Sequence, residues 1–259
     1  MMPDAHAAFT DRLVTRVASE ADVLGFVTLG SSSGLGAPAD AYSDHDFFVV
    51  TRTGAQERFR TDPSWLPDAG ELVLHFRETA HGVKALYTSG HLVEFAVFDL
   101  DELALARVNR YRVVLDRADV AARLEAVRTA TRATAAAPPD MRWHAGQLIT
   151  ALVVGVGRAA RGERLSGHRL VRAVALDHLL VLLRAQRPDA PERDDLDPAR
   201  RFEQTFPALG DELDRALQLP IEAAARALLE LASHELGALI APAAHDAVAG
   251  VLARVADHR

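Results

Sequence analysis

The chain has 259 residues, enough for one large domain or two ordinary ones, and its 49% hydrophobic and 25% charged residues are typical of a globular protein. The net charge of −7 does not favour binding of a long polyanion, so we expect a small substrate and not DNA or RNA. The absence of cysteine excludes disulfides, thiolate zinc sites and a cysteine nucleophile.

The first part of the chain is predicted to form a sheet. The opening segment places Phe9, Leu13 and Val17 on one face of an amphipathic helix. Asp99 and Glu102 have the spacing of a capping box and predict the start of a short helix. Up to residue 117, β-rich runs alternate with Gly, Pro and Asp and predict strands at 23–29, 44–50, 71–77, 83–88, 92–98 and 113–115.

The second part is predicted to be helical throughout. Proline and glycine separate helical patterns at 119–136, 142–161, 167–186, 200–206, 211–218, 221–238 and 243–257. The predicted fold class is therefore α+β, with a mixed-sheet N-terminal domain (residues 1–117) followed by a C-terminal helical bundle (residues 118–259).

No segment predicts a membrane or secretory location. The amino-terminal residues mix charges into the apolar positions and lack the h-region of a signal peptide. The most apolar stretch, 148–156, is too short to span a bilayer and is expected to be a buried helix. A chain without cysteine also suits a reducing compartment, so we expect a cytoplasmic protein with no membrane partner.

Asp44 and Asp46 are the first candidate site. They stand two residues apart on a predicted strand, so their side chains leave the same face with Cβ atoms about 6–7 Å apart. Two carboxylates at so short a separation repel one another unless a cation lies between them, and their oxygens are the hard ligands that Mg²⁺ prefers. The alternative is a solvated Asp pair that serves as a turn.

Three further features favour a phosphate-handling site. A strand ends at Gly30-Ser31, where glycine allows close backbone approach and the serine hydroxyl can donate to a phosphate. A Ser/Gly-rich loop without periodicity then leads to Asp44. Glu94 interrupts the apolar run 93–98, where a carboxylate is costly without a cation or partner. The alternative to a functional role for Glu94 is that it is an acid at the sheet edge or part of a buried ion pair.

Together these residues resemble the polymerase-β-type nucleotidyltransferase superfamily. The shared motif is Gly30-Ser31, a loop, Asp44-His45-Asp46, and a third acid, Glu94, on a later strand. Antibiotic adenylyltransferases of the lincosamide and aminoglycoside types are nearest, because their acidic sheet also precedes a helical half. Arg161-Gly162-Glu163-Arg164 resembles a turn between two helices of their second domain. The aromatic pair Phe47-Phe48 departs from their usual small aliphatic residues.

The resemblance implies Mg²⁺-dependent transfer of AMP, or another NMP, from a nucleoside triphosphate to a hydroxyl of a small molecule. In this interpretation Asp44 and Asp46 hold the metal, and Gly30 and Ser31 bind the nucleotide. Glu94 is the general base or completes the metal shell. Arg161 and Arg164 bind the β- and γ-phosphates, unless they are ordinary surface arginines at a helix end.

Several alternatives stay open. One alternative is a nucleotidyltransferase whose acceptor is a protein or a nucleotide, as in toxin–antitoxin nucleotidyltransferases. The other is a non-catalytic nucleotide-binding or interaction module. The co-substrate is expected to be ATP, and a homodimer is left open. The eleven histidines form no zinc pattern. Trp143 and His144 open a helix, where core packing is expected and acceptor contact is the alternative.

Overall fold

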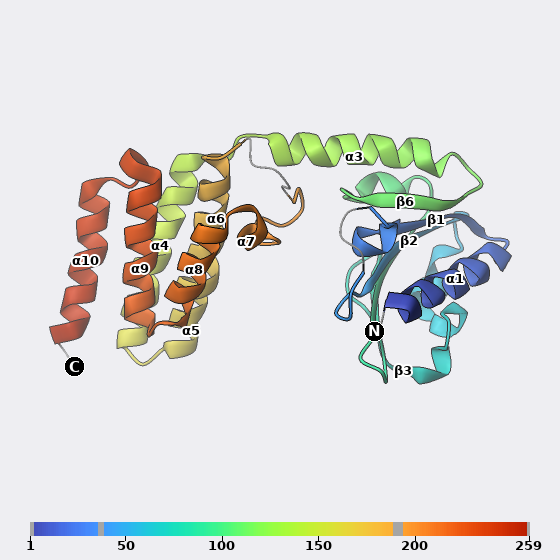
Figure 1. The fold of residues 1–259 in the computed structure, drawn as a ribbon, viewed down its shortest axis with the longest axis horizontal. Coiled ribbons are helices and arrows are strands. Elements are labelled where there is room, and N and C mark those ends of the chain that lie inside the picture. Colours follow the sequence, from blue (N-terminus) through green and yellow to red (C-terminus); the bar gives the residue numbers. More distant parts are fainter. Residues whose placement is uncertain (1–2, 36–38, 189–193, 258–259) are drawn as a thin grey trace. The chain divides into compact units, whose positions relative to one another are not determined.

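The computed structural model describes residues 3–35, 39–188 and 194–257. The chain divides into two compact units, Met1–Ala135 and Ala136–Arg259 (Figure 1). The predicted α+β class is confirmed, because the first unit contains a six-stranded mixed sheet and the second consists of helices.

The sheet of unit 1 brings distant parts of the sequence together. Its order is β3-β4-β5-β2-β1-β6, and neighbouring strands are antiparallel except for β2 and β5, which run parallel. This pairing places Asp46 of β2 opposite Glu94 of β5. The strands are β1 (Val23–Leu29), β2 (His45–Thr51), β3 (Leu72–Arg77), β4 (Gly82–Tyr87), β5 (Leu92–Phe98) and β6 (Tyr111–Asp116).

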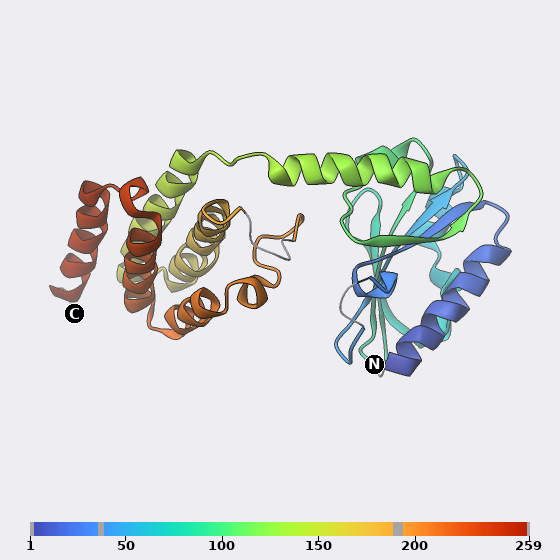
Figure 2. The ribbon, with the colours of Figure 1, turned by 45° about the horizontal axis from the view of Figure 1, so that its top comes forward.

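One face of the sheet is covered by α1 (Pro3–Ser19), which lies along the strands in Figure 2. The predicted helical face of Phe9, Leu13 and Val17 is buried against the sheet residues Phe26 and Phe47. A short helix α2 (Gln56–Thr61) and the 3₁₀ turns η2 (Pro63–Trp65) and η3 (Ala69–Glu71) complete this layer. None of these three short elements was expected from the sequence.

The other face is partly covered by α3 (Val120–Ala136). Its apolar stripe, Val120, Leu124 and Val127, packs against sheet residues that include Val27 and Val50. The helix therefore belongs to the sheet unit, whereas the sequence-based boundary at 117/118 placed it in the bundle. The periodicity predicts the helix but does not show which core its stripe enters.

The predicted capping box is present where the chain leaves β5. The Asp99 carboxylate accepts hydrogen bonds from the amides of Asp101 (2.9 Å) and Glu102 (2.8 Å). The Glu102 carboxylate accepts in return from the Asp99 amide at 3.2 Å. The helix that follows is a single 3₁₀ turn, η4 (Glu102–Leu105).

Unit 2 has one hydrophobic core built around α4, whose residues Leu148, Leu152 and Val156 are fully buried. Gly155 and Gly167 allow close helix packing, because a Cβ at Gly167 would lie 2.8 Å from the Gly155 carbonyl oxygen. The elements are α4 (Met141–Ala160), α5 (Arg164–Arg169), the π turn η5 (Leu170–Val174), α6 (Ala175–Ala185), α7 (Phe202–Thr205), α8 (Pro207–Gln218), α9 (Ile221–Leu236), η6 (Gly237–Leu239) and α10 (Pro242–Asp257).

The buried helix expected at 148–156 is thus confirmed within α4. In the described residues, we find no helix with the length and apolar character needed to cross a membrane.

We expect Leu124→Ala to lower the free energy of unfolding of unit 1 by about 2–5 kcal/mol, because it opens a cavity between α3 and the sheet. Urea unfolding in a Trp143→Phe background isolates this unit, since the only other tryptophan, Trp65, is buried in its core. Arg132→Ala, on the exposed side of the same helix, is the control. Equal losses in the two variants would contradict the packing of α3.

Candidate functional site

The three predicted acids converge on one face of the sheet. Asp44, Asp46 and Glu94 are each half-buried, and each offers a carboxylate oxygen within 4.8 Å of the others. Asp46 and Glu94 meet through the register of β2 and β5. Asp44 lies one residue before β2, which begins at His45 rather than at Asp44 as predicted. The alternation predicted around Glu94 is confirmed, because Val93, Phe95 and Val97 are buried on the opposite face.

This carboxylate cluster has the donor set of a Mg²⁺ site. Two oxygens on opposite sides of a Mg²⁺ ion lie about 4.2 Å apart, given metal–oxygen distances of 2.0–2.1 Å. Adjacent oxygens of an octahedral ion lie about 2.9 Å apart. The three carboxylates, whose oxygens lie within 4.8 Å of one another, would therefore have to draw closer to bind one ion. The three acids are held by strands or by a segment entering a strand, so their positions are restrained.

The Gly30-Ser31 turn lies beside the cluster. Gly30 has φ = 51°, in the left-handed region, and a Cβ at this position would lie 3.6 Å from Oδ2 of Asp46. The turn is the 3₁₀ segment η1 (Gly30–Ser33), which follows β1 directly. The Ser33 hydroxyl donates to the Gly30 carbonyl at 2.7 Å and holds the turn closed.

A cationic residue that the sequence did not reveal stands next to this turn. The Gly30 amide donates to the carbonyl of Arg110 at 3.1 Å, so the chain before β6 runs alongside the predicted phosphate turn. This proximity depends on the pairing of β1 with β6, which are separated by more than eighty residues in the sequence.

Lys84 is the second residue that sequence reasoning missed. It lies opposite Glu94 in the β4–β5 pair, and its Nζ is 3.0 Å from Glu94 Oε1 and 2.9 Å from Glu78 Oε1. Hydrogen bonds to Glu78 and Glu94 raise the pKa of Lys84 to about 12. Glu94 therefore has the ion pair considered as the alternative to a catalytic role, but the pair is half-exposed and adjoins the two aspartates.

A layer of histidines supports the Asp44-His45-Asp46 segment from the α1 side of the sheet. The His6 ring stacks on His45 with centroids 3.6 Å apart, and His6 Nε2 donates to the Asp44 carbonyl at 3.1 Å. His45 Nε2 lies 2.9 Å from the Thr10 hydroxyl oxygen and 3.2 Å from the His6 carbonyl. Because a carbonyl only accepts, this nitrogen carries the proton. His45 Nδ1 then accepts from His91 Nε2 at 2.7 Å.

Two histidines of this layer, His45 and His91, have pKa values well below the ordinary value and are uncharged at neutral pH. Burial, followed by the neighbouring His6 and His91, lowers the pKa of His45 to about 3. Burial, followed by His6, lowers the pKa of His91 to about 4. Their rings thus position the backbone between the two aspartates without adding charge to the site.

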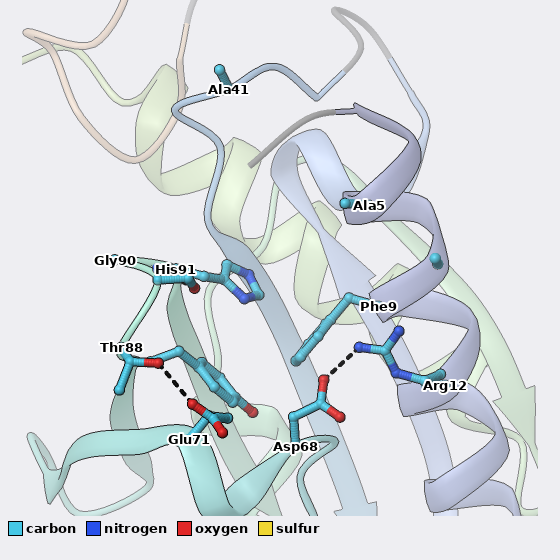
Figure 3. A pocket seen from close by; sticks show the side chains of 12 residues that line it. Ala5, Phe9, Arg12, Ala41, Asp68, Glu71, Thr88, Gly90 and His91 are labelled. Atoms are coloured by element: carbon cyan, nitrogen blue, oxygen red, sulfur yellow. Dashed lines mark hydrogen bonds and ion pairs between the residues drawn. The ribbon is translucent and has the colours of Figure 1, made fainter.

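A pocket of about 580 Å³ opens on this same α1 side (Figure 3). Phe9, Tyr87 and His91 form its nearly buried floor. Its rim carries an Arg12–Asp68 ion pair at 2.6 Å and a hydrogen bond from Thr88 to Glu71 at 3.0 Å. The carboxylate cluster faces the other side of the sheet, so this pocket adjoins the supporting histidines and not the acids.

Comparisons with known proteins give structural matches alone. No protein-family model and no curated protein matches the chain. An aminoglycoside 6-adenyltransferase from Bacillus subtilis matches with 12% identity and a TM-score of 0.40, over 96% of this chain and 98% of that one. The STING-associated CdnE c-di-GMP synthase from Capnocytophaga granulosa matches with 10% identity and a TM-score of 0.31, over 98% and 79%.

Both matches are nucleotidyltransferases. At 12% and 10% identity, neither match assigns a function to this chain.

The predicted contributions of unit 2 remain predictions. Arg161 and Arg164 flank the turn between α4 and α5, as expected, and Arg161 contacts Glu163 at 3.1 Å. Trp143 is 53% exposed, so the expected core packing is wrong for this residue. Its ring makes edge contacts with His144 and His178, whose Nδ1 atoms are 2.9 Å apart.

We expect unit 1 to lose roughly 2–5 kcal/mol of stability between pH 6.5 and pH 4.5. The folded-state pKa values of His45 and His91 lie below the ordinary value of 6.5, so protons bind the unfolded chain first as the pH falls. The stability that the two neutral rings contribute is fully present above pH 6.5. It is lost as the pH falls toward their folded-state pKa values.

Urea unfolding of the Trp143→Phe protein across this pH range measures the loss, which His45→Gln should reduce. His234→Gln, at an 84% exposed side chain, should leave the pH dependence unchanged. A flat profile in the parent protein would contradict the lowered pKa values of His45 and His91.

Proposed function

We propose that the chain is a Mg²⁺-dependent nucleotidyltransferase that moves AMP, or another NMP, from a nucleoside triphosphate to a hydroxyl of a small molecule. The observation that carries this proposal is the convergence of Asp44, Asp46 and Glu94 beside the Gly30 turn. A solvated aspartate pair that merely forms a turn requires neither the third acid nor the glycine.

The proposed reaction is an in-line displacement at the α-phosphorus. The acceptor oxygen forms a bond to phosphorus, the bond to the β-phosphate oxygen breaks, and pyrophosphate leaves with its electron pair. Mg²⁺ bound by the aspartates would neutralise charge on the triphosphate and the leaving group. The Gly30-Ser31 turn would offer the Ser31 hydroxyl to the phosphates, since the Gly30 amide already donates to the Arg110 carbonyl.

Glu94 is proposed to accept the proton of the acceptor hydroxyl. Lys84 contacts its carboxylate at 3.0 Å and so restrains the position of the proposed base. Glu94 is also close enough to Asp44 and Asp46 to serve as a third metal ligand. The two roles differ in what its removal does to nucleotide binding.

The acids also bear on the alternatives. A non-catalytic module that has lost its activity has no need to preserve three converging carboxylates, so their arrangement favours an enzyme. The proposal further includes ATP as the co-substrate and Arg161 and Arg164 as phosphate ligands. Its acceptor is a small molecule of the lincosamide or aminoglycoside type.

Asp44→Asn and Asp46→Asn are each expected to abolish transfer and to lower Mg²⁺-dependent ATP affinity by at least about tenfold, because each removes a charged ligand. Titration calorimetry with ATP, with and without Mg²⁺, measures binding, and pyrophosphate release measures transfer. Asp11→Asn, an exposed change of equal charge on α1, is the control. Variants that keep wild-type Mg²⁺-dependent turnover would refute the metal assignment.

Glu94→Gln is expected to slow the chemical step by about 10²–10⁴-fold, the usual contribution of a positioned base, while Mg²⁺–ATP affinity stays unchanged. If Glu94 is instead a metal ligand, affinity falls as well. Glu78→Gln is the matched control, because it removes the other carboxylate on Lys84 without touching the acid cluster. Single-turnover kinetics and calorimetry separate the cases, and a wild-type rate removes Glu94 from the mechanism.

A further inference from the structure

The sheet face that carries Glu94 continues over β4 and β3 as an open face formed by Leu74, Phe76, Lys84, Leu86, Leu92 and Glu94. Burial alternates along these strands. Val83, Ala85 and Tyr87 of β4 are buried on the α1 side, whereas Lys84 and Leu86 between them are half-exposed. Phe76 is 42% exposed and Leu74 is 49% exposed.

The strand register orders this face into two rows. Phe76, Lys84, Glu94 and Asp46 stand opposite one another in turn across β3, β4, β5 and β2. Leu74, Leu86 and Leu92 form the neighbouring row. Adjacent strands are about 4.8 Å apart, so Phe76 lies about 10 Å from Glu94, which is the length of a small-molecule acceptor.

This face is not part of a hydrophobic core. In the part of the chain that the structure describes, Leu74, Phe76, Leu86 and Leu92 belong to none of the three buried clusters and are not packed against them. Large apolar side chains exposed together beside candidate catalytic groups are characteristic of a binding surface.

The charge on the face favours one class of ligand. Its carboxylates, Glu94 and the bordering Glu78, both contact Lys84 at hydrogen-bond distance. A polycation needs several carboxylates available for its ammonium groups, whereas here the acids already share a cation and leucines occupy the next row.

We propose that the open face binds the acceptor, and that the acceptor is an amphipathic molecule with an apolar side and a hydroxyl directed at Glu94, not a polycation. The inference rests on the proposed nucleotidyl transfer and specifies its second substrate. The sheet order supports it, because the Gly30 turn follows β1 on one side of the acids while β4 and β3 extend on the other. Nucleotide and acceptor would thus approach Glu94 from opposite sides.

The test compares lincomycin, an amphipathic monocation, with kanamycin, a polycation, by calorimetry on the full chain with Mg²⁺ and a non-hydrolysable ATP analogue. We expect lincomycin to bind and kanamycin not to bind. Leu74→Ser and Phe76→Ser should each weaken lincomycin binding by about tenfold, the effect of losing half of a buried apolar side chain. Leu105→Ser, at a 69% exposed leucine of η4, should have no effect.

The nucleotide measurement distinguishes this inference from the function on which it rests. Unchanged analogue affinity in the two serine variants, with weakened lincomycin binding, supports the open face as the acceptor site. Preference for kanamycin, binding of neither probe, or lincomycin binding unaffected by both variants overturns it. So does a wild-type dimer that Phe76→Ser dissociates, since a second copy would then cover the face. Failure of Mg²⁺-dependent analogue binding in the wild type instead rejects nucleotidyl transfer itself.

Discussion

The parallel pairing of β2 with β5 is the constraint on which the candidate site depends. It places Asp46 directly opposite Glu94, although 47 positions and two strands separate these residues in the chain. Asp44 lies two residues before Asp46, so its side chain is on the same face of the sheet and reaches the other two acids. A slip of one residue in this pairing would move Glu94 to the α1 side, where Val93 and Phe95 are packed, and dissolve the cluster.

Gathering three carboxylates costs electrostatic free energy, and the surrounding residues reduce that cost without removing it. Lys84 supplies one positive charge on the open side of Glu94. On the packed side the chain uses neutral imidazoles, so His45 separates the two aspartates in sequence yet adds no charge. The remaining negative charge is what a divalent cation would balance.

The sequence predicts the local parts of this structure well and the long-range parts poorly. Strands 23–29 and 92–98, the capping box at Asp99 and the opening helical face of Phe9, Leu13 and Val17 follow from patterns within a few residues. Lys84 and Arg110 were missed because only strand pairing brings each of them next to the site. The association of α3 with the sheet was missed for a similar reason, since an apolar stripe does not identify its partner.

The two faces of the sheet differ in a way that explains where chemistry can occur. On the α1 side, large aromatic residues and the histidine layer pack against β2, and the pocket on this side reaches His91 but not the acids. On the other side α3 and η4 pack on Val50, Phe48 and Phe98, toward the far ends of β2 and β5. Asp46 and Glu94 lie nearer the beginnings of the same strands, where this packing stops and their side chains stay half-exposed. The same strands are therefore restrained at one end, where a core holds them, and accessible at the other, where the proposed metal, nucleotide and acceptor would meet.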